Sequence, residues 1–157
     1  MKPKNLSKSL PEAEATLGTL LRRPYEHMSE WLYAELVKHG FDDVRPAFSA
    51  VLRNLPANGA RVVDLAQRAG MTKQSMGYLV DQMLAAGLVE IAPDLQDRRA
   101  NTVRLTNRGE AVVATGIALS KLYESNLAQL VGEAKLAQLR STLHEIYQLL
   151  DEPALPA

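Results

Sequence analysis

The chain contains no cysteine. This absence excludes disulfide bridges, thiolate metal sites, cysteine nucleophiles and cysteine redox sensors. No apolar run approaches the roughly 20 residues of a membrane-spanning helix. The lysines of the opening residues MKPKNLSKSLPEAE are not followed by the apolar core of a secretory signal. We therefore expect a cytoplasmic protein with no membrane partner.

Recognisable catalytic motifs are also missing. The sequence holds neither the Gly-x-Ser-x-Gly turn of serine hydrolases nor a phosphate-binding loop. Glu35 and His39 are four residues apart and would share a helix face, but such a pair falls far short of a closed metal-ligand set. The sequence thus predicts no enzyme, no catalytic residues, no metal site and no cofactor.

The chain has no net charge, because 18 basic residues balance 18 acidic ones. A neutral chain still binds nucleic acid where its positive charge is local. Residues 98–108 hold four arginines (Arg98, Arg99, Arg104 and Arg108) and no acid, whereas residues 111–157 hold three basic and five acidic residues. The charge is therefore segregated. A solvated surface loop is the alternative explanation of this arginine cluster.

Hydrophobic spacing predicts a mainly α-helical chain with a small β-hairpin. Glycines and turn residues separate the expected elements, and Pro24 is expected to kink or break the first helix. Helices are predicted over residues 17–40, 44–55, 62–69, 73–86, 107–131 and 133–150, and strands over residues 88–91 and 101–105.

Residues 62–83 carry the strongest functional signal. Two short helices are joined by AGMT, in which Gly70 can adopt the positive φ of a sharp turn. Apolar residues form a wedge between the helices, namely Leu65, Met71, Met76 and Leu79. This arrangement predicts a helix-turn-helix whose second helix enters the DNA major groove. An ordinary helical hairpin with a polar outer face is the alternative.

The exposed start of the second helix carries side chains suited to DNA. Thr72 is expected to cap it. Gln74 can pair with adenine, and Lys73 can reach guanine or phosphate. A helix-turn-helix followed by two strands and a basic turn is a winged helix. In it, Arg99 is predicted to enter the minor groove, aimed by Asp97, while Arg98 and Arg104 meet phosphates.

The wing DLQDRRA (residues 94–100), followed by VRLTNRG (residues 103–109), resembles the wing signature of the MarR family of transcriptional regulators. TKQSMGYLVDQMLAAGLVE (residues 72–90) resembles that family's recognition helix and first wing strand. The resemblance implies an obligate homodimer that binds a palindromic DNA operator, often released by a small aromatic effector. We therefore expect a sequence-specific, ligand-responsive repressor.

The expected DNA-contacting residues lie on this helix and wing: Thr72, Lys73, Gln74, Ser75, Gly77, Tyr78, Asp97, Arg98, Arg99 and Arg104. Three positions depart from the family pattern. Tyr78 stands where a basic residue is common, Leu84 where Glu is usual, and Ile91 where Arg is frequent. We expect an altered base preference and the loss of one phosphate contact.

One domain-sized chain, residues 1–157, is expected, with the winged helix-turn-helix at residues 44–109 and dimerisation helices at residues 13–40 and 110–150. The last helix carries an apolar stripe at near-heptad spacing: Leu136, Leu139, Leu143, Ile146 and Leu150. A symmetry mate would bury this stripe. Packing of the first and last helices on each other within one subunit is the alternative.

By the same resemblance, aromatic residues of the first two helices are candidates for an effector cleft: Tyr25, Trp31 and Phe48. Core or dimer packing is their more ordinary role. Two other function classes stay open. A winged-helix module for protein–protein assembly would need no arginine wing tip. A ligand-binding or enzymatic bundle would need convergent polar residues, which the sequence does not show.

Overall fold

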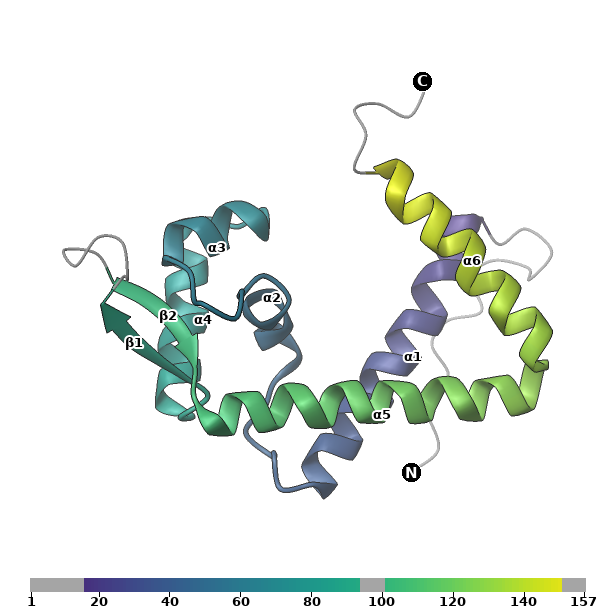
Figure 1. Ribbon diagram of the computed structural model, residues 1–157, viewed down its shortest axis with the longest axis horizontal. Helices are drawn as coiled ribbons and strands as arrows, with labels where there is room; N and C mark the ends of the chain where they lie inside the picture. The colour runs from purple at the N-terminus through teal and green to yellow at the C-terminus, as the bar shows by residue number, and fades with distance from the viewer. Residues whose placement is uncertain (1–15, 94–100, 151–157) are drawn as a thin grey trace. The chain divides into compact units, whose positions relative to one another are not determined.

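The computed structural model describes residues 16–93 and 101–150 (Figure 1). The chain divides into two compact units, residues 1–116 and 117–157. It is mostly helical with one two-stranded antiparallel hairpin, which confirms the predicted fold class. The elements are α1 (Leu17–Lys38), η2 (Pro46–Phe48), α2 (Ser49–Leu52), α3 (Val62–Arg68), α4 (Lys73–Ala85), β1 (Val89–Pro93), β2 (Asn101–Leu105), α5 (Asn107–Val131) and α6 (Glu133–Leu150).

Helix α1 continues through Pro24, so this residue does not break the helix. Proline removes one intrahelical hydrogen bond, and the bonds on either side maintain the helix. Gly40, at φ 84°, ends α1 as expected. The Phe41 amide then donates to the Leu36 carbonyl at 3.0 Å, which is the Schellman pattern of a helix end.

The predicted helix over residues 44–55 is wrong in its bounds. The structure has a 3₁₀ turn, η2, followed by the four-residue α2. Pro46 excludes the α conformation from the residue before it, and Arg45 is extended at φ −109° and ψ 149°. At the other end, the Asn54 side chain donates to the Ala50 carbonyl at 2.8 Å and competes with the backbone for this acceptor.

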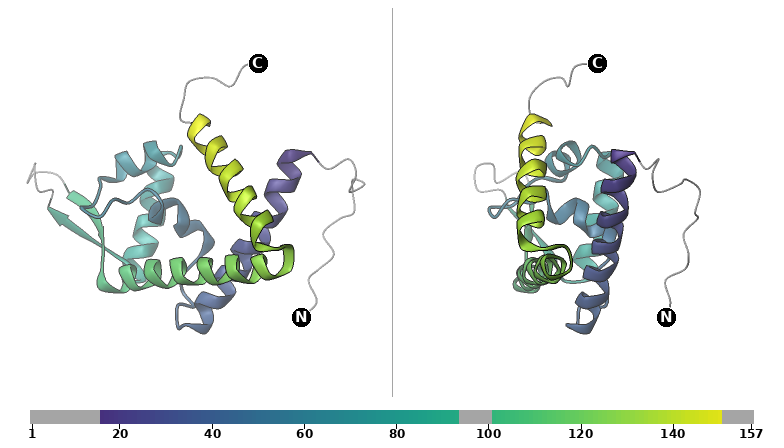
Figure 2. Two further views of the ribbon diagram at one scale, coloured as in Figure 1. Left: turned by 45° about the vertical axis from the view of Figure 1, so that its right-hand side comes forward. Right: turned by 90° about the vertical axis from the view of Figure 1, so that its right-hand side faces the viewer.

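Helices α3 and α4 form the predicted helix-turn-helix. Gly70 has φ 62°, and the Met71 amide donates to the Ala66 carbonyl at 2.8 Å, closing α3 in a second Schellman turn. Leu65, Met76 and Met83 are fully buried. The hairpin lies beside α4 and extends away from the helices (Figures 1 and 2), so α4 is held between α3 and the hairpin.

The hairpin pairs β1 with β2, in register from Val89 opposite Leu105 to Pro93 opposite Asn101. A further bridge joins Ala60 to Val103, with backbone hydrogen bonds of 3.1 and 2.8 Å in the two directions. Nothing in the sequence predicts this bridge, because a single paired residue has no periodicity. The bridge ties the loop before α3 to the second wing strand.

Helix α6 differs from the winged region because none of its residues is buried. Gly132, at φ 95°, separates α6 from α5. Arg140 of α6 pairs with Glu124 of α5. No helix within residues 16–93 and 101–150 is long and apolar enough to cross a membrane.

Candidate nucleic-acid interface

The start of α4 is a capped helix end. The Thr72 hydroxyl accepts a hydrogen bond from the Ser75 amide at 3.1 Å and donates to the Ser75 hydroxyl at 2.9 Å. The cap satisfies one of the free amides of the first turn. The predicted role of Thr72 as the N-cap is therefore confirmed, and the hydroxyls of Thr72 and Ser75 are already engaged with each other.

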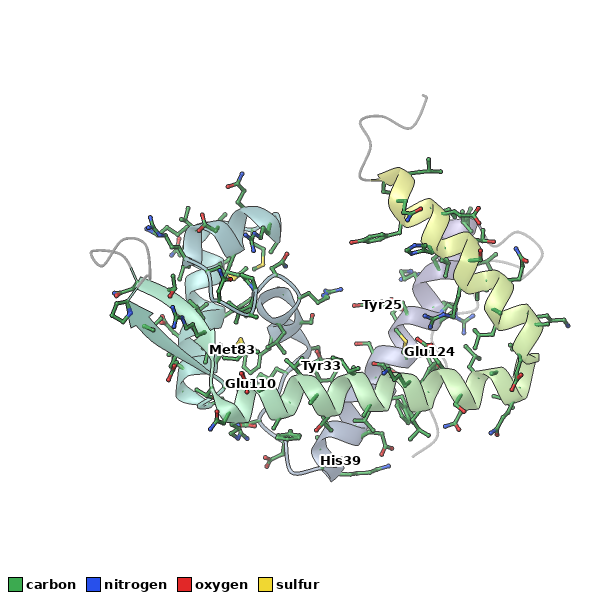
Figure 3. The ribbon with its side chains drawn as sticks, in the orientation of Figure 1. Tyr25, Tyr33, His39, Met83, Glu110 and Glu124 are labelled. Carbon is green, nitrogen blue, oxygen red and sulfur yellow. The ribbon has the colours of Figure 1, made fainter. Side chains whose placement is uncertain are left out.

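The two faces of α4 differ sharply in exposure. Four residues hold the inner face in the core: Met76, Leu79, Val80 and Met83, the last labelled in Figure 3. Thr72, Lys73, Gln74, Ser75 and Tyr78 are exposed, and Gly77 is half-buried. The structure therefore brings all six predicted recognition-helix residues together near the start of one helix. Their contact with DNA stays a prediction.

An open groove of about 570 Å³ runs along one side of this helix start. Its lining is mostly apolar: Ala47, Ala50, Met71, Gln74, Ser75, Tyr78 and Leu79. Gln74 and Tyr78 thus border free space, which allows their side chains to change rotamer when a partner approaches.

The predicted wing-tip residues Asp97, Arg98 and Arg99 lie outside the described residues. Arg104 is described and stands opposite Glu90 in the hairpin register. Its side chain lies over Gly59, where an added Cβ would come within 2.7 Å of the Arg104 Cγ atom. The Arg104 Nε atom is buried there without a hydrogen-bond partner among the described residues. Phosphate contact by Arg104 stays a prediction.

Arg108, the last arginine of the four-arginine cluster, binds groups within the fold. It lies in the first turn of α5. Its Nη2 atom donates to the Asp43 carboxylate at 2.8 Å, and its Nη1 atom donates to the Ala86 carbonyl at 2.7 Å. The guanidinium carbon is 5.9 Å from the centre of the Phe41 ring. The hydrogen bond from Arg108 lowers the pKa of Asp43 below its ordinary value.

The residues around Arg108 join the end of α4 to the start of α5. The Thr106 hydroxyl donates to the Gly87 carbonyl at 2.6 Å, and the Thr106 amide donates to the Leu88 carbonyl at 3.1 Å. The same hydroxyl accepts from the Gly109 amide at 3.1 Å and so caps α5. A Cβ on Gly109 would lie 2.0 Å from the Leu88 carbonyl oxygen, so only glycine fits.

The candidate effector residues are spread over different environments. Phe48 is 2% exposed and belongs to the core, whereas Tyr25, which projects from α1 (Figure 3), is 50% exposed. Trp31 is half-buried on α1. The neighbouring Tyr33 donates to the Pro46 carbonyl at 3.4 Å, and burial raises its pKa. Effector binding by Tyr25, Trp31 and Phe48 stays a prediction.

The side chains of Glu35 and His39 do not face a common ligand position, because each has another partner. His39 Nδ1 lies 2.8 Å from the Glu35 carbonyl oxygen, and the Glu35 carboxylate pairs with Lys38 at 2.5 Å. Within the described part of the chain, no three His, Asp or Glu side chains gather into a potential metal site.

Comparison with known proteins identifies the same region. Residues 43–100 match the model of the MarR family. The transcriptional activatory protein BadR of Rhodopseudomonas palustris is 30% identical over 102 residues, which are 65% of this chain and 57% of BadR. The exopolysaccharide II synthesis transcriptional activator ExpG of Rhizobium meliloti is 24% identical over 133 residues, covering 85% of this chain and 68% of ExpG.

Solved structures agree with the sequence relatives. The transcriptional repressor CouR bound to a 23-mer DNA duplex superposes with a TM-score of 0.66 at 25% identity, covering 90% of this chain and 99% of CouR. The match thus extends beyond the winged region to nearly the whole fold. The family resemblance seen in the wing and recognition-helix motifs is confirmed for the winged helix-turn-helix, which matches the MarR family model, and the fold is similar to that of CouR.

Proposed function

We propose that the protein is a transcriptional regulator that binds double-stranded DNA sequence-specifically through α4 and the hairpin wing. The carrying observation is the start of α4, where five predicted contact residues are exposed on a capped helix whose inner face is fixed in the core. Such a helix end offers free amides to phosphates and side chains to base edges. The DNA complex of CouR, a protein of the same fold, supports this proposal.

Within this proposal, Lys73, Gln74 and Tyr78 are the principal base-reading residues. Their side chains are exposed, whereas the hydroxyls of Thr72 and Ser75 already bond each other. Tyr78 is 64% exposed and borders the groove beside α2. An aromatic ring at this position favours apolar contact with a thymine methyl group over the guanine contacts of a basic side chain.

The protein acts as a homodimer on a palindrome in this proposal. Helix α6 leaves Leu139, Leu143, Ile146 and Leu150 each at least 38% exposed, as an unpaired apolar stripe. A two-fold partner would cover the stripe and present a second α4. The half-sites should then lie about 10 base pairs apart, or a multiple of this spacing.

The direction of regulation does not follow from the relatives. BadR and ExpG are named as activators and CouR as a repressor. The position of the operator relative to a promoter decides between the two outcomes, because the same DNA contacts serve both. We therefore propose regulation without the repressor role that the family resemblance first suggested. We retain an aromatic effector near Tyr25 and Trp31 as the proposed signal.

Selection of bound sequences from random duplexes tests the proposed function directly. We expect enrichment of a palindrome, with binding that weakens steeply as salt rises because the protein displaces counterions. Gln74→Ala should reduce discrimination at one base position by about 1–3 kcal/mol. Enrichment of no sequence, together with the absence of any salt-dependent DNA binding, would favour the protein–protein module instead.

The wing roles need a comparison of two neighbouring arginines. We propose that Arg99, which follows Asp97 by two residues, enters the minor groove and that Arg98 contacts phosphate. Arg98→Ala should weaken binding to all sequences and reduce the salt slope by about one unit. Arg99→Ala should weaken binding most on A·T-rich flanks. If Arg98→Ala and Arg99→Ala cause indistinguishable losses of affinity on both A·T-rich and G·C-rich flanks, the minor-groove role is wrong and the wing only contacts the DNA backbone.

A further inference from the structure

The C-terminal end of α4 is held by side chains of residues that lie outside the predicted DNA-contacting set. Like α1 and α3, α4 ends in a Schellman turn, in which the Leu88 amide donates to the Met83 carbonyl at 2.9 Å. This turn leaves the carbonyls of Ala86 and Gly87 facing away from the helix ladder. Arg108 and Thr106 donate to them at 2.7 and 2.6 Å. Side chains at the start of α5 thereby supply hydrogen-bond donors to the two carbonyls that follow α4.

Arg108 also reaches a third element. Its Nη2 atom donates to the carboxylate of Asp43, in the segment between α1 and η2, 65 residues away in sequence. Phe41 of the same segment lies against the guanidinium. One planar side chain therefore connects the chain after α1, the carbonyl of Ala86 at the C-cap of α4 and the first turn of α5, all within the unit of residues 1–116.

We propose that Arg108 and Asp43 are positioning residues that fix the orientation of α4 for reading DNA, an inference that rests on the proposed DNA-binding function. The geometry favours this role over simple stabilisation. The side chains of Arg108 and Asp43 are 37% and 42% exposed, and an exposed ion pair of this kind contributes little to folding stability. The planar guanidinium of Arg108, which binds two acceptors at once, instead fixes the orientation of the groups that it joins.

The orientation of α4 matters because base readout needs short, directed hydrogen bonds. A small rotation of the helix about its tethered end displaces Lys73 and Gln74 at the opposite end by a larger distance. Phosphate contacts tolerate such a displacement better, since they depend mainly on charge. Loosening the tether should therefore reduce discrimination between sequences more than it reduces total DNA affinity.

Asp43→Asn distinguishes a change in charge alone from a loosened contact at the end of α4, because the two have different effects on DNA affinity and on sequence discrimination. Removal of a negative charge alone should leave DNA binding unchanged or tighten it on every sequence. A loosened tether should lower the ratio of affinities for the selected operator and for a scrambled duplex by about threefold to tenfold. Arg108→Lys keeps the charge but cannot hold both acceptors in one fork, so it should lower the ratio similarly.

Arg68→Ala is the matched control. Arg68 donates to the Asn54 carbonyl at 3.2 Å, so this variant also removes an arginine–carbonyl tether from the winged region, at the end of α3 rather than of α4. It should leave the operator-to-scrambled ratio unchanged, even if it weakens both affinities. Thermal melts of all variants show whether each chain is folded at the assay temperature.

Amide hydrogen exchange supplies a readout that does not depend on DNA. Asp43→Asn and Arg108→Lys should accelerate exchange at Gly87 and Leu88, while Gly70 and Met71 at the end of α3 keep their wild-type rates. Unchanged exchange at Gly87 and Leu88, or an unchanged affinity ratio in both folded variants, would overturn the positioning role. A wild-type protein that shows no sequence preference while the exchange result holds would instead overturn the proposed DNA reading.

Discussion

The winged region and helix α6 differ in whether their apolar side chains are buried. In the winged region, Leu65, Met76, Met83 and Leu88 are 0% exposed, α3 and α4 both end in a Schellman turn, and Thr72 caps the start of α4. In α6, 18 residues contain no buried side chain, although every third or fourth residue is apolar. The same chain thus holds one region with its own core and one region whose apolar surface is uncovered.

This difference indicates which part of the chain can fold alone and which part a second copy would cover. Isolated helices of this length are marginal in water, because helix propensity alone hardly compensates the cost of nucleation. The winged region has its own core and needs no partner to order α4. Under the proposed function, α6 depends on a partner and determines how many recognition helices meet the DNA.

The largest expected effect comes from changing the apolar stripe of α6. Leu139→Glu combined with Leu143→Glu places two charges where the proposed partner would pack, so the dimer should be lost completely. Sedimentation at micromolar concentration should show a monomer or an unfolded chain. Gln138→Glu combined with Gln148→Glu adds the same charge to α6 off the stripe and should leave the dimer intact. A dimer that survives the stripe variant would place the interface elsewhere.

Met83→Ala tests the opposite region. This side chain is fully buried in the winged core, so its truncation should lower the free energy of unfolding by about 2–5 kcal/mol. Urea denaturation of the wild type and the variant, at one protein concentration, measures the difference. The sedimentation behaviour of the folded variant should stay that of the wild type. A loss below about 1 kcal/mol would mean that the core around Met83 collapses to fill the space.

Gly109→Ala should destabilise the joint between α4 and α5. The new Cβ would lie 2.0 Å from the Leu88 carbonyl oxygen, so the backbone must shift at a cost of about 1–3 kcal/mol. Gly116→Ala in the same helix is the control, because an added Cβ there has nothing within 4 Å. Thermal unfolding should separate the two, with Gly116→Ala at or above wild-type stability. Similar melting temperatures for both variants would contradict the close approach.

The smallest expected change in stability belongs to Gly77, and its sign is opposite. Gly77 lies inside α4, and an added Cβ would meet nothing within 4 Å, so Gly77→Ala should stabilise the fold by about 0.5–1 kcal/mol. The same methyl group would stand on the predicted DNA-contacting part of α4 and should weaken operator binding. Calorimetry and a DNA titration on one preparation test both effects. Tighter operator binding by this variant would show that DNA does not approach Gly77.

Local patterns made most of this fold predictable. Gly70 marked the turn of the helix-turn-helix, Thr72 marked the cap of α4, and alternation marked both strands, because each depends on residues close in sequence. The helix bounds near Pro46 failed because proline restricts the residue before it, and that restriction competed with a helical hydrophobic pattern.

The candidate site was less predictable where it depends on distant residues. The sequence shows Arg108 only as the last member of an arginine cluster, whereas its partners Asp43 and Ala86 lie 65 and 22 residues away. The local sequence around Arg108 does not predict those partners. The glycine of the motif LTNRG was visible in the sequence, but its physical reason, the approach of the Leu88 carbonyl, appears only in the structure.

Our central claim is that the winged region reads DNA and that α6 brings two chains together. The most direct test measures the mass and the affinity of the protein–DNA complex on a selected palindrome and on the same duplex with one half-site scrambled. The account predicts two chains on the intact palindrome and an affinity at least about tenfold weaker on the scrambled duplex, since one recognition helix then loses its base contacts. A single bound chain, or equal affinity for both duplexes, would contradict the account.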